Sequence, residues 1–435
     1  ITYTTESGCD FKIIQMATLE KCVQVMMSKD FNDNYFQECF VLAYRLVTTP
    51  DKLLELLGVL FDPNVPEGMQ FAQFVKEILS PLRLKIMNFI RIWMKNAWKD
   101  FEAKDELIDK LQQFLDRFNR FNAKLGAAMT RQLEHRIAHV DTTNEPSGDL
   151  TDPVVLESNS KFVNVLQFHP AEFARQITLL QSEMFKQIPY FEFLGNGWMK
   201  KDKETLTPNI MRLVRSTQKL FHFVQTSILI DNDPIKRVIF LHFFIHAADE
   251  MRKIKNFEGM KAVVSAIQSS PIFRLKDTWD CLTNDDIQVE KGLESLCDQE
   301  KNFSKLREAM KVATPPSIPF LGSTMGDLVF TDDGNKKGDE AKSLINWFKV
   351  RGIGNLIKEI MVKQSSFYNF KKLDEFVKYY DKPPILDDQD QLFELSLSYE
   401  QKRPETLTSD IEKKISKLRK EGHAAIKKYV KFYSK

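Results

Sequence analysis

Apolar residues recur at spacings of three and four along most of the chain, which is the pattern of amphipathic helices. One set of such stripes runs over residues 10–135, and a second set runs over residues 161–404. Thr49 followed by Pro50 is typical of a helix start, because a capping hydroxyl precedes a proline whose missing N–H would be unbonded anyway. Residues 136–160 lose the spacing and gain turn-forming residues. The pattern predicts two helical modules joined by a linker.

Two segments depart from the ordinary amphipathic pattern. Residues 234–254 are apolar on nearly all sides, which indicates a helix at the centre of the second module. Residues 405–435 are expected to form a basic amphipathic helix, with a lysine-rich polar face from residue 409 onward. This last helix could pack on the module with its lysines in solvent, or residues 409–435 could lie on an anionic membrane surface. We favour packing and keep the membrane interpretation as an alternative.

The segment from Pro315 to about Phe370 has an unusual order of features. A stiff, proline-rich stretch is followed by a turn-like sequence at 332–335 and then by two short apolar stripes. Arg351-Gly352 separates the stripes. We predict a helical hairpin over about 336–370, standing on a proline-stiffened base. The stripes consist of Ala341, Leu344, Ile345 and Phe348, and of Ile353, Leu356, Ile357, Ile360 and Met361.

Composition narrows the class of protein. The chain has 435 residues with 43% hydrophobic and 28% charged residues, which is typical of a soluble globular protein with two or three domains. Only 16 glycines favour an all-helical fold. A net charge of +2 argues against general nucleic-acid binding. The five cysteines form no C-x-x-C pair, which indicates a reducing compartment. No apolar run is long enough to span a bilayer, and no signal peptide is evident.

The sequence offers no constellation for covalent chemistry. It lacks a phosphate-binding G-x-x-x-x-G-K-[ST] loop, a nucleophile elbow and an H-E-x-x-H motif. The only metal-like spacing is His242, His246 and Glu250 on one face of a helix. Because that helix is expected to be buried on most sides, we predict hydrogen-bonded histidines there, and neither a metal nor a cofactor.

The second module contains ordered blocks that resemble the catalytic domain of Ras-family guanine-nucleotide exchange factors. The blocks are His169–Leu180, Trp198, Pro208–Ile210, Asn256–Met260, Ser270–Trp279, Pro315–Gly322 with Asp327-Leu328 and Gly334-Asn335, and Glu394–Glu400. The first module resembles the Ras exchanger motif that precedes such domains, through Ala17–Lys21, Phe40–Arg45 and Thr48–Leu54. Together the two resemblances cover roughly residues 10–404.

The resemblance implies an all-α fold in which an N-terminal exchanger-motif domain precedes a bowl-shaped catalytic domain with a protruding hairpin. It implies a regulator of GTPases that breaks no covalent bond. In the family, the hairpin displaces one switch loop of a Ras-subfamily GTPase (Ras, Rap or Ral type), and two side chains at its base intrude on the magnesium and phosphate positions. Val329 and Asp333 match those side chains. A carboxylate opposes a bound phosphate, and an apolar group cannot replace a magnesium ligand.

Further residues match GTPase-binding or framework positions of the family. Arg215, Thr217 and Leu220 match the helix that contacts the second switch, and Phe320 and Trp279 match framework aromatics. Gln268 stands where the family has an asparagine that supports the switch contact, and Asp333 is one methylene shorter than the usual glutamate. We expect a cytoplasmic exchange factor that is recruited to the membrane carrying its lipidated GTPase. The alternative is a catalytically silent homologue that binds a GTPase as an adaptor.

Overall fold

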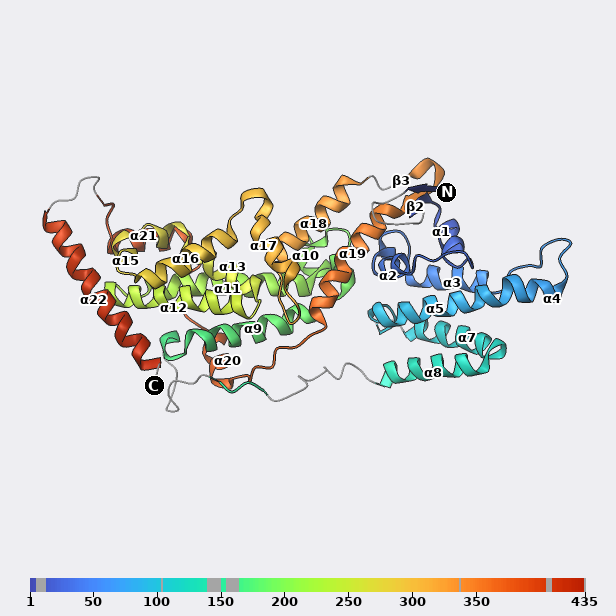
Figure 1. The fold of residues 1–435 in the computed structure, drawn as a ribbon, viewed down its shortest axis with the longest axis horizontal. Helices are drawn as coiled ribbons and strands as arrows, with labels where there is room; N and C mark the ends of the chain where they lie inside the picture. Colours follow the sequence, from blue (N-terminus) through green and yellow to red (C-terminus); the bar gives the residue numbers. More distant parts are fainter. Residues whose placement is uncertain are drawn as a thin grey trace. The chain divides into compact units, whose positions relative to one another are not determined.

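The computed structural model describes residues 1–4, 13–102, 105–138, 150–153, 164–335, 338–403 and 409–433 (Figure 1). Most of the predicted linker therefore lies outside the described residues. The chain forms two compact units, which are described separately below. Unit 1 comprises Ile1–Glu145, Pro189–Thr207 and Thr324–Met361, and unit 2 comprises Pro146–Ile188, Pro208–Ser323 and Val362–Lys435. Both units are mainly helical, as predicted.

Unit 1 joins the N-terminal helices to the hairpin segment. Its short helices and turns include η1 (Tyr44–Leu46), the π-helix η2 (Val75–Leu79), η4 (Tyr190–Phe193), η5 (Gly197–Met199), α10 (Lys203–Leu206) and η6 (Glu340–Lys342). Its N-terminal helices are α1 (Leu19–Met26), α2 (Asn34–Ala43), α3 (Pro50–Phe61), α4 (Phe71–Phe74), α5 (Ser80–Asn96), α6 (Lys99–Glu102), α7 (Asp105–Phe121) and α8 (Ala123–Ala138). The predicted start of α3 is confirmed, since the Thr49 side chain accepts a hydrogen bond from the Lys52 N–H.

The predicted pair of hairpin helices is corrected by the structure. The first arm is α18 (Leu321–Gly334), which occupies the stretch that we read as a stiff base and a turn. The second arm is α19 (Trp347–Gln364), which continues through Arg351-Gly352 without a break. Helices tolerate a single glycine at a cost of about 1 kcal/mol, and packing of both faces offsets that cost here.

The stretch between the arms forms part of a small antiparallel sheet, which the sequence did not lead us to expect. Its strands are β1 (Thr2–Thr4), β2 (Ile13–Ala17), β3 (Gly338–Asp339) and β4 (Leu344–Asn346), in the order β1-β2-β4-β3. Leu344 and Ile345, which we assigned to a helical stripe, are adjacent strand residues. Strand β4 pairs with β2, so the far end of the hairpin is fastened to the N-terminal segment of unit 1.

Helix α19 packs directly against α2. The fully buried Trp347 ring stacks on Phe40, with centroids 5.5 Å apart, and donates a hydrogen bond to the Ala17 carbonyl. Gly354 permits the close approach, because a Cβ there would lie 2.2 Å from the Cys39 carbonyl oxygen. A buried ion pair links Arg351 of α19 to the residue that caps α2. The hairpin is therefore an integral part of the unit 1 core.

Unit 2 is built around one buried helix, as the sequence predicted. Helix α12 (Pro234–Lys253) lies among its neighbours (Figure 1). Most of its apolar side chains are buried in the core cluster of the unit. The other elements are η3 (Val165–Gln167), α9 (Pro170–Lys186), α11 (Pro208–Leu229), α13 (Phe257–Ile267), α14 (Ser270–Phe273), α15 (Lys276–Trp279), α16 (Asn284–Cys297), α17 (Glu300–Val312), α20 (Asp374–Asp381), α21 (Gln389–Tyr399) and α22 (Ser409–Tyr433).

Helix α22 packs on α12, as the favoured interpretation of the basic tail required. Ile426 is 3% exposed and lies in one apolar cluster with Val238 and Cys281, against which Leu418 also packs. Arg419 donates a hydrogen bond to the Asp280 carbonyl. The lysines of α22 that pair within the helix remain exposed.

Candidate functional site

The two residues predicted to oppose nucleotide binding lie on one face of α18, near its C-terminal end. Val329 is half-buried and Asp333, one helical turn further on, is exposed. The adjacent Phe330 is 79% exposed, which is unusual for so large an apolar side chain. This end of α18 thus presents an acidic group and a large apolar group to solvent.

A lysine of α19 holds this end of α18 in place. Lys349 Nζ lies 2.8 Å from Asp332 Oδ1 and donates hydrogen bonds to the carbonyls of Asp332 (2.6 Å) and Asn335 (3.2 Å). A cation at the C-terminal carbonyls complements the helix dipole. The arms also approach closely, since a Cβ at Gly352 would lie 3.2 Å from Thr331 Cγ2. Lys349 therefore holds the backbone on either side of Asp333.

The residues predicted on α11 have different environments in unit 2. Arg215 is exposed, and Thr217 is half-buried. Leu220 is fully buried in the hydrophobic core of unit 2, and its role in GTPase binding stays a prediction.

A buried carboxylate connects α11, α13 and the start of α18 within unit 2. Glu258 of α13 is 4% exposed. It accepts hydrogen bonds from the Thr217 hydroxyl (2.8 Å) and from the Leu321 N–H (2.7 Å), the first backbone donor of α18. Burial raises the pKa of Glu258 above its ordinary value, and the two hydrogen bonds oppose that shift. Glu258 therefore positions the start of α18. It belongs to the Asn256–Met260 block of the sequence, but the motif alone assigned it no role.

The proline-rich base of the hairpin is fastened to the α12–α13 connection. Ile318 receives a hydrogen bond from the Phe257 N–H and donates one to the Lys255 carbonyl. Asn256, fully buried, caps α13 and donates to Thr178 and Gln181 of α9. These bonds fix the entry into α18 against two helices of unit 2.

The contacts recorded for the three remaining predicted residues are with other residues of unit 2. Gln268 caps the C-terminal end of α13 and donates to Glu290 at 3.3 Å. The Trp279 indole donates to the Ile272 carbonyl at 3.0 Å. The Phe320 ring packs edge-to-face on Phe303, with centroids 5.7 Å apart. Their roles in GTPase binding remain predictions.

The two histidines of α12 contact a different acid from the Glu250 that we considered in the sequence. His242 and His246 both contact Asp286 of α16, whereas Glu250 bonds with Lys253. Both histidines are hydrogen-bonded, as expected. Asp286 lies 40 residues beyond His246, so no local motif could have identified it.

Comparison with known proteins identifies the class of protein that these helices form. Residues 13–114 match the RasGEF N-terminal motif, and residues 172–351 match the RasGEF domain. The chain thus carries an exchanger motif followed by a catalytic-type domain. It belongs to the family of Ras guanine-nucleotide exchange factors.

Curated relatives from distant organisms match most of this chain. Ras guanine nucleotide exchange factor P of Dictyostelium discoideum is 27% identical over 406 residues, covering 88% of this chain and 26% of the relative. Human Ras-specific guanine nucleotide-releasing factor 1 is 31% identical over 326 residues, covering 74% and 25%. Protein son of sevenless of Drosophila melanogaster is 26% identical over 398 residues, covering 82% and 24%. The chain spans about a quarter of the length of these relatives.

The search for membrane-spanning helices gave a negative result. Within the described ranges, no helix combines the length and the apolar character needed to cross a bilayer.

Proposed function

We propose that the chain promotes the release of GDP, and hence the loading of GTP, on a small GTPase of the Ras subfamily (Ras, Rap or Ral type). The observation that carries the proposal is the end of α18, where Asp333 is exposed and Lys349 holds the backbone behind it. Family membership supports the choice of GTPase class, since relatives of this chain are named as Ras-specific releasing factors.

The proposed mechanism requires binding energy and no covalent step. A surface that binds the nucleotide-free GTPase more tightly than the loaded one must weaken nucleotide binding by the same factor. Asp333 would oppose the phosphates by its charge, and Val329 would take space from a magnesium ligand without replacing it. Rigidity matters because a hairpin that yields would lose the differential affinity.

Residues on the surface of unit 2 would provide the second part of the interaction. Arg215 is exposed on α11 and would contact the GTPase directly. Thr217 would act through Glu258, which it helps to hold. Gln268, Phe320 and Trp279 would support this surface from the positions described above.

The experiment is a fluorescent-GDP release assay of the chain against purified Ras, Rap and Ral proteins. At least one GTPase should release GDP at least about tenfold faster than its intrinsic rate, a change of about 1.4 kcal/mol in the barrier. The second candidate, an adaptor that binds a GTPase without exchanging its nucleotide, would give binding with no acceleration. The exposed acid at Asp333 favours exchange over that alternative.

A further inference from the structure

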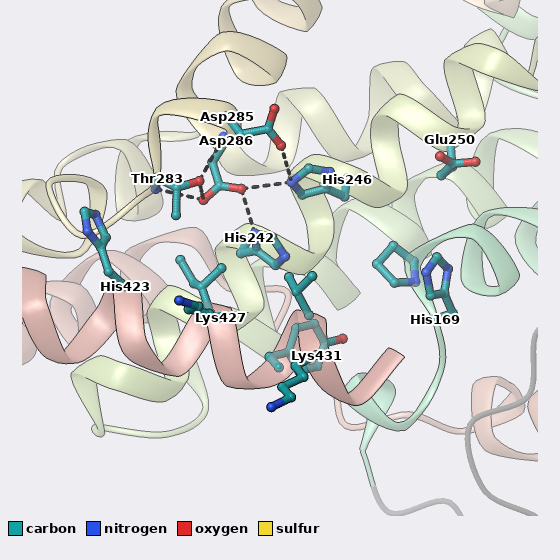
Figure 2. A pocket seen from close by; sticks show the side chains of 14 residues that line it. His169, His242, His246, Glu250, Thr283, Asp285, Asp286, His423, Lys427 and Lys431 are labelled. Atoms are coloured by element: carbon teal, nitrogen blue, oxygen red, sulfur yellow. Dashed lines mark hydrogen bonds and ion pairs between the residues drawn. The ribbon is translucent and has the colours of Figure 1, made fainter. Parts of the chain in front are cut away.

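A second site lies in unit 2, in a cavity of about 790 Å³ between α12, α16 and α22. Its charged and imidazole lining, shown in Figure 2, includes His169, His242, His246, His423, Glu250, Asp285, Asp286, Lys427 and Lys431. The exchange mechanism uses none of these side chains. At one wall of the cavity His242, His246 and Asp286 meet, whereas His169 and Glu250 lie apart from them.

The three side chains converge on one point. His242 Nδ1 lies 2.6 Å from Asp286 Oδ1, and His246 Nε2 lies 2.8 Å from the same oxygen atom. The three candidate ligand atoms all lie within 4.8 Å of one another. The histidines stand four residues apart on α12, so helix geometry places both rings on one face. One hydrogen bond would be enough to link α12 to α16, whereas here two imidazoles contact the same carboxylate oxygen.

The carboxylate is held in place by other groups. Its second oxygen, Asp286 Oδ2, accepts hydrogen bonds from the Thr283 N–H (2.9 Å) and hydroxyl (2.8 Å), which form the capping box of α16. The His242 ring packs edge-on against Tyr429 of α22, with centroids 5.9 Å apart. Such outer contacts orient metal ligands in known sites, because they fix the carboxylate and the ring before the ion arrives.

We propose that His242, His246 and Asp286 bind one divalent transition-metal ion of the zinc class. Two imidazoles and one carboxylate form a ligand set that suits Zn²⁺, whereas Mg²⁺ and Ca²⁺ prefer oxygen ligands alone. Each neutral imidazole would direct a lone pair to the ion, with its proton on His242 Nε2 and on His246 Nδ1. Thr283 would keep the free oxygen of the carboxylate in position.

The nitrogen–oxygen distances in the cluster are shorter than those around a bound zinc ion, so binding would require a small movement. Ligand atoms around a tetrahedral zinc ion are roughly 3.3 Å apart, so the separations of 2.6 and 2.8 Å from Asp286 Oδ1 would have to grow by about 0.7 and about 0.5 Å. The His246 side chain is 26% exposed and free to make that movement. A fourth position faces the cavity, where water would bind. Asp285, 81% exposed and 4.0 Å from His246 Nε2, is close enough to replace it.

The test measures zinc bound by the full chain. The protein is stripped with a chelator, incubated with a slight excess of Zn²⁺, freed of unbound metal by gel filtration and analysed by mass spectrometry of the metal. We expect one zinc per chain in the wild type, and an affinity at least about tenfold weaker in His246→Gln and in Asp286→Asn. The matched control is His423→Gln, which removes a histidine of the same cavity that bonds to the Leu282 carbonyl instead.

A spectroscopic readout protects the test against a folding defect in one variant. Co²⁺ should give the intense visible absorption of a tetrahedral site in the wild type and in His423→Gln, and saturating Zn²⁺ should raise the thermal midpoint of both by mass action. His246→Gln, the milder variant, should keep its helical circular dichroism, lose the intense Co²⁺ absorption and show a smaller rise in thermal midpoint at the same Zn²⁺ concentration. Substoichiometric zinc in the wild type, or equal zinc in wild type and His246→Gln, would overturn the proposal.

Discussion

Glu258 shows what a single buried residue contributes to the exchange surface. Its carboxylate receives the Thr217 hydroxyl and the first N–H of α18 in unit 2. Replacing it by alanine would remove the acceptor of the Leu321 N–H, while the Thr217 hydroxyl would keep only the Leu213 carbonyl, at a cost of about 2 kcal/mol in unfolding free energy. The position of α18 thus depends on a residue that need not touch any GTPase.

The raised pKa of Glu258 gives a prediction with a definite sign. Because burial raises the native pKa above 4.5, the native state keeps a proton that the unfolded state has lost as pH rises. Glu258 therefore contributes less stability at neutral pH than below its unfolded pKa. Urea unfolding of wild type and Glu258→Gln at about pH 4 and about pH 7 should show the difference shifting in favour of glutamine at the higher pH. A shift in the opposite direction would show that the carboxylate is stabilised as an anion.

Asp333 carries the charge argument of the proposed mechanism. Asp333→Lys should slow GDP release about tenfold, because a cation would attract the phosphates that the carboxylate repels. Binding to nucleotide-free GTPase should change little. The control is Glu134→Lys, which makes the same charge change at an exposed site on α8. Equal release rates for Asp333→Lys and the wild type would count against an electrostatic role.

At the scale of elements, α19 is the support of the hairpin. Gly354→Ala should lower the free energy of unfolding by about 2 kcal/mol and slow GDP release, because the new Cβ would clash with backbone atoms of α2. The matched control, Gly292→Ala, adds the same methyl group to α16 where nothing lies within 4 Å. That control should be neutral or slightly stabilising, since alanine favours a helix. Thermal and urea unfolding distinguish the two, and similar losses in both would refute the close-packing account.

Helix α22 gives a prediction that separates packing from membrane binding. Removing residues 409–435 would expose Val238 and Cys281, which are fully buried beside Ile426. We expect the thermal midpoint to fall by about 5 °C or more, because each uncovered apolar side chain costs roughly 1.5–3 kcal/mol. An unchanged midpoint together with lost binding to anionic vesicles would restore the membrane interpretation.

The elements also show how far sequence reasoning reaches. The apolar pattern identified α12 as the buried centre of unit 2, and the Thr49-Pro50 pair identified the start of α3. Both signals are local in the sequence. Periodicity failed at 338–346, where Leu344 and Ile345 satisfy a helical spacing but belong to strand β4, which pairs with β2 and β3. It also placed a helix break at Gly352, where the glycine instead allows two helices to pack closely. Each of these errors concerns contacts between distant parts of the chain.

At the scale of the whole molecule, the family motifs located the predicted site residues but not what holds them. Lys349 and Glu258 were missed because a lysine in an apolar stripe and an acid at a helix start have ordinary local explanations. Asp286 was missed because its partners lie 40 and 44 residues away. The burial of Leu220 was not foreseen, because a motif records a position and not its burial.

The central claim is that this chain accelerates nucleotide release through the end of α18. The most direct measurement is the GDP-release rate of the responding GTPase with wild-type chain and with the double variant Val329→Ala, Asp333→Lys. We predict at least about tenfold acceleration by the wild type and a return to nearly the intrinsic rate with the double variant. Equal acceleration by both proteins, or none from the wild type with any Ras, Rap or Ral protein, would contradict the account.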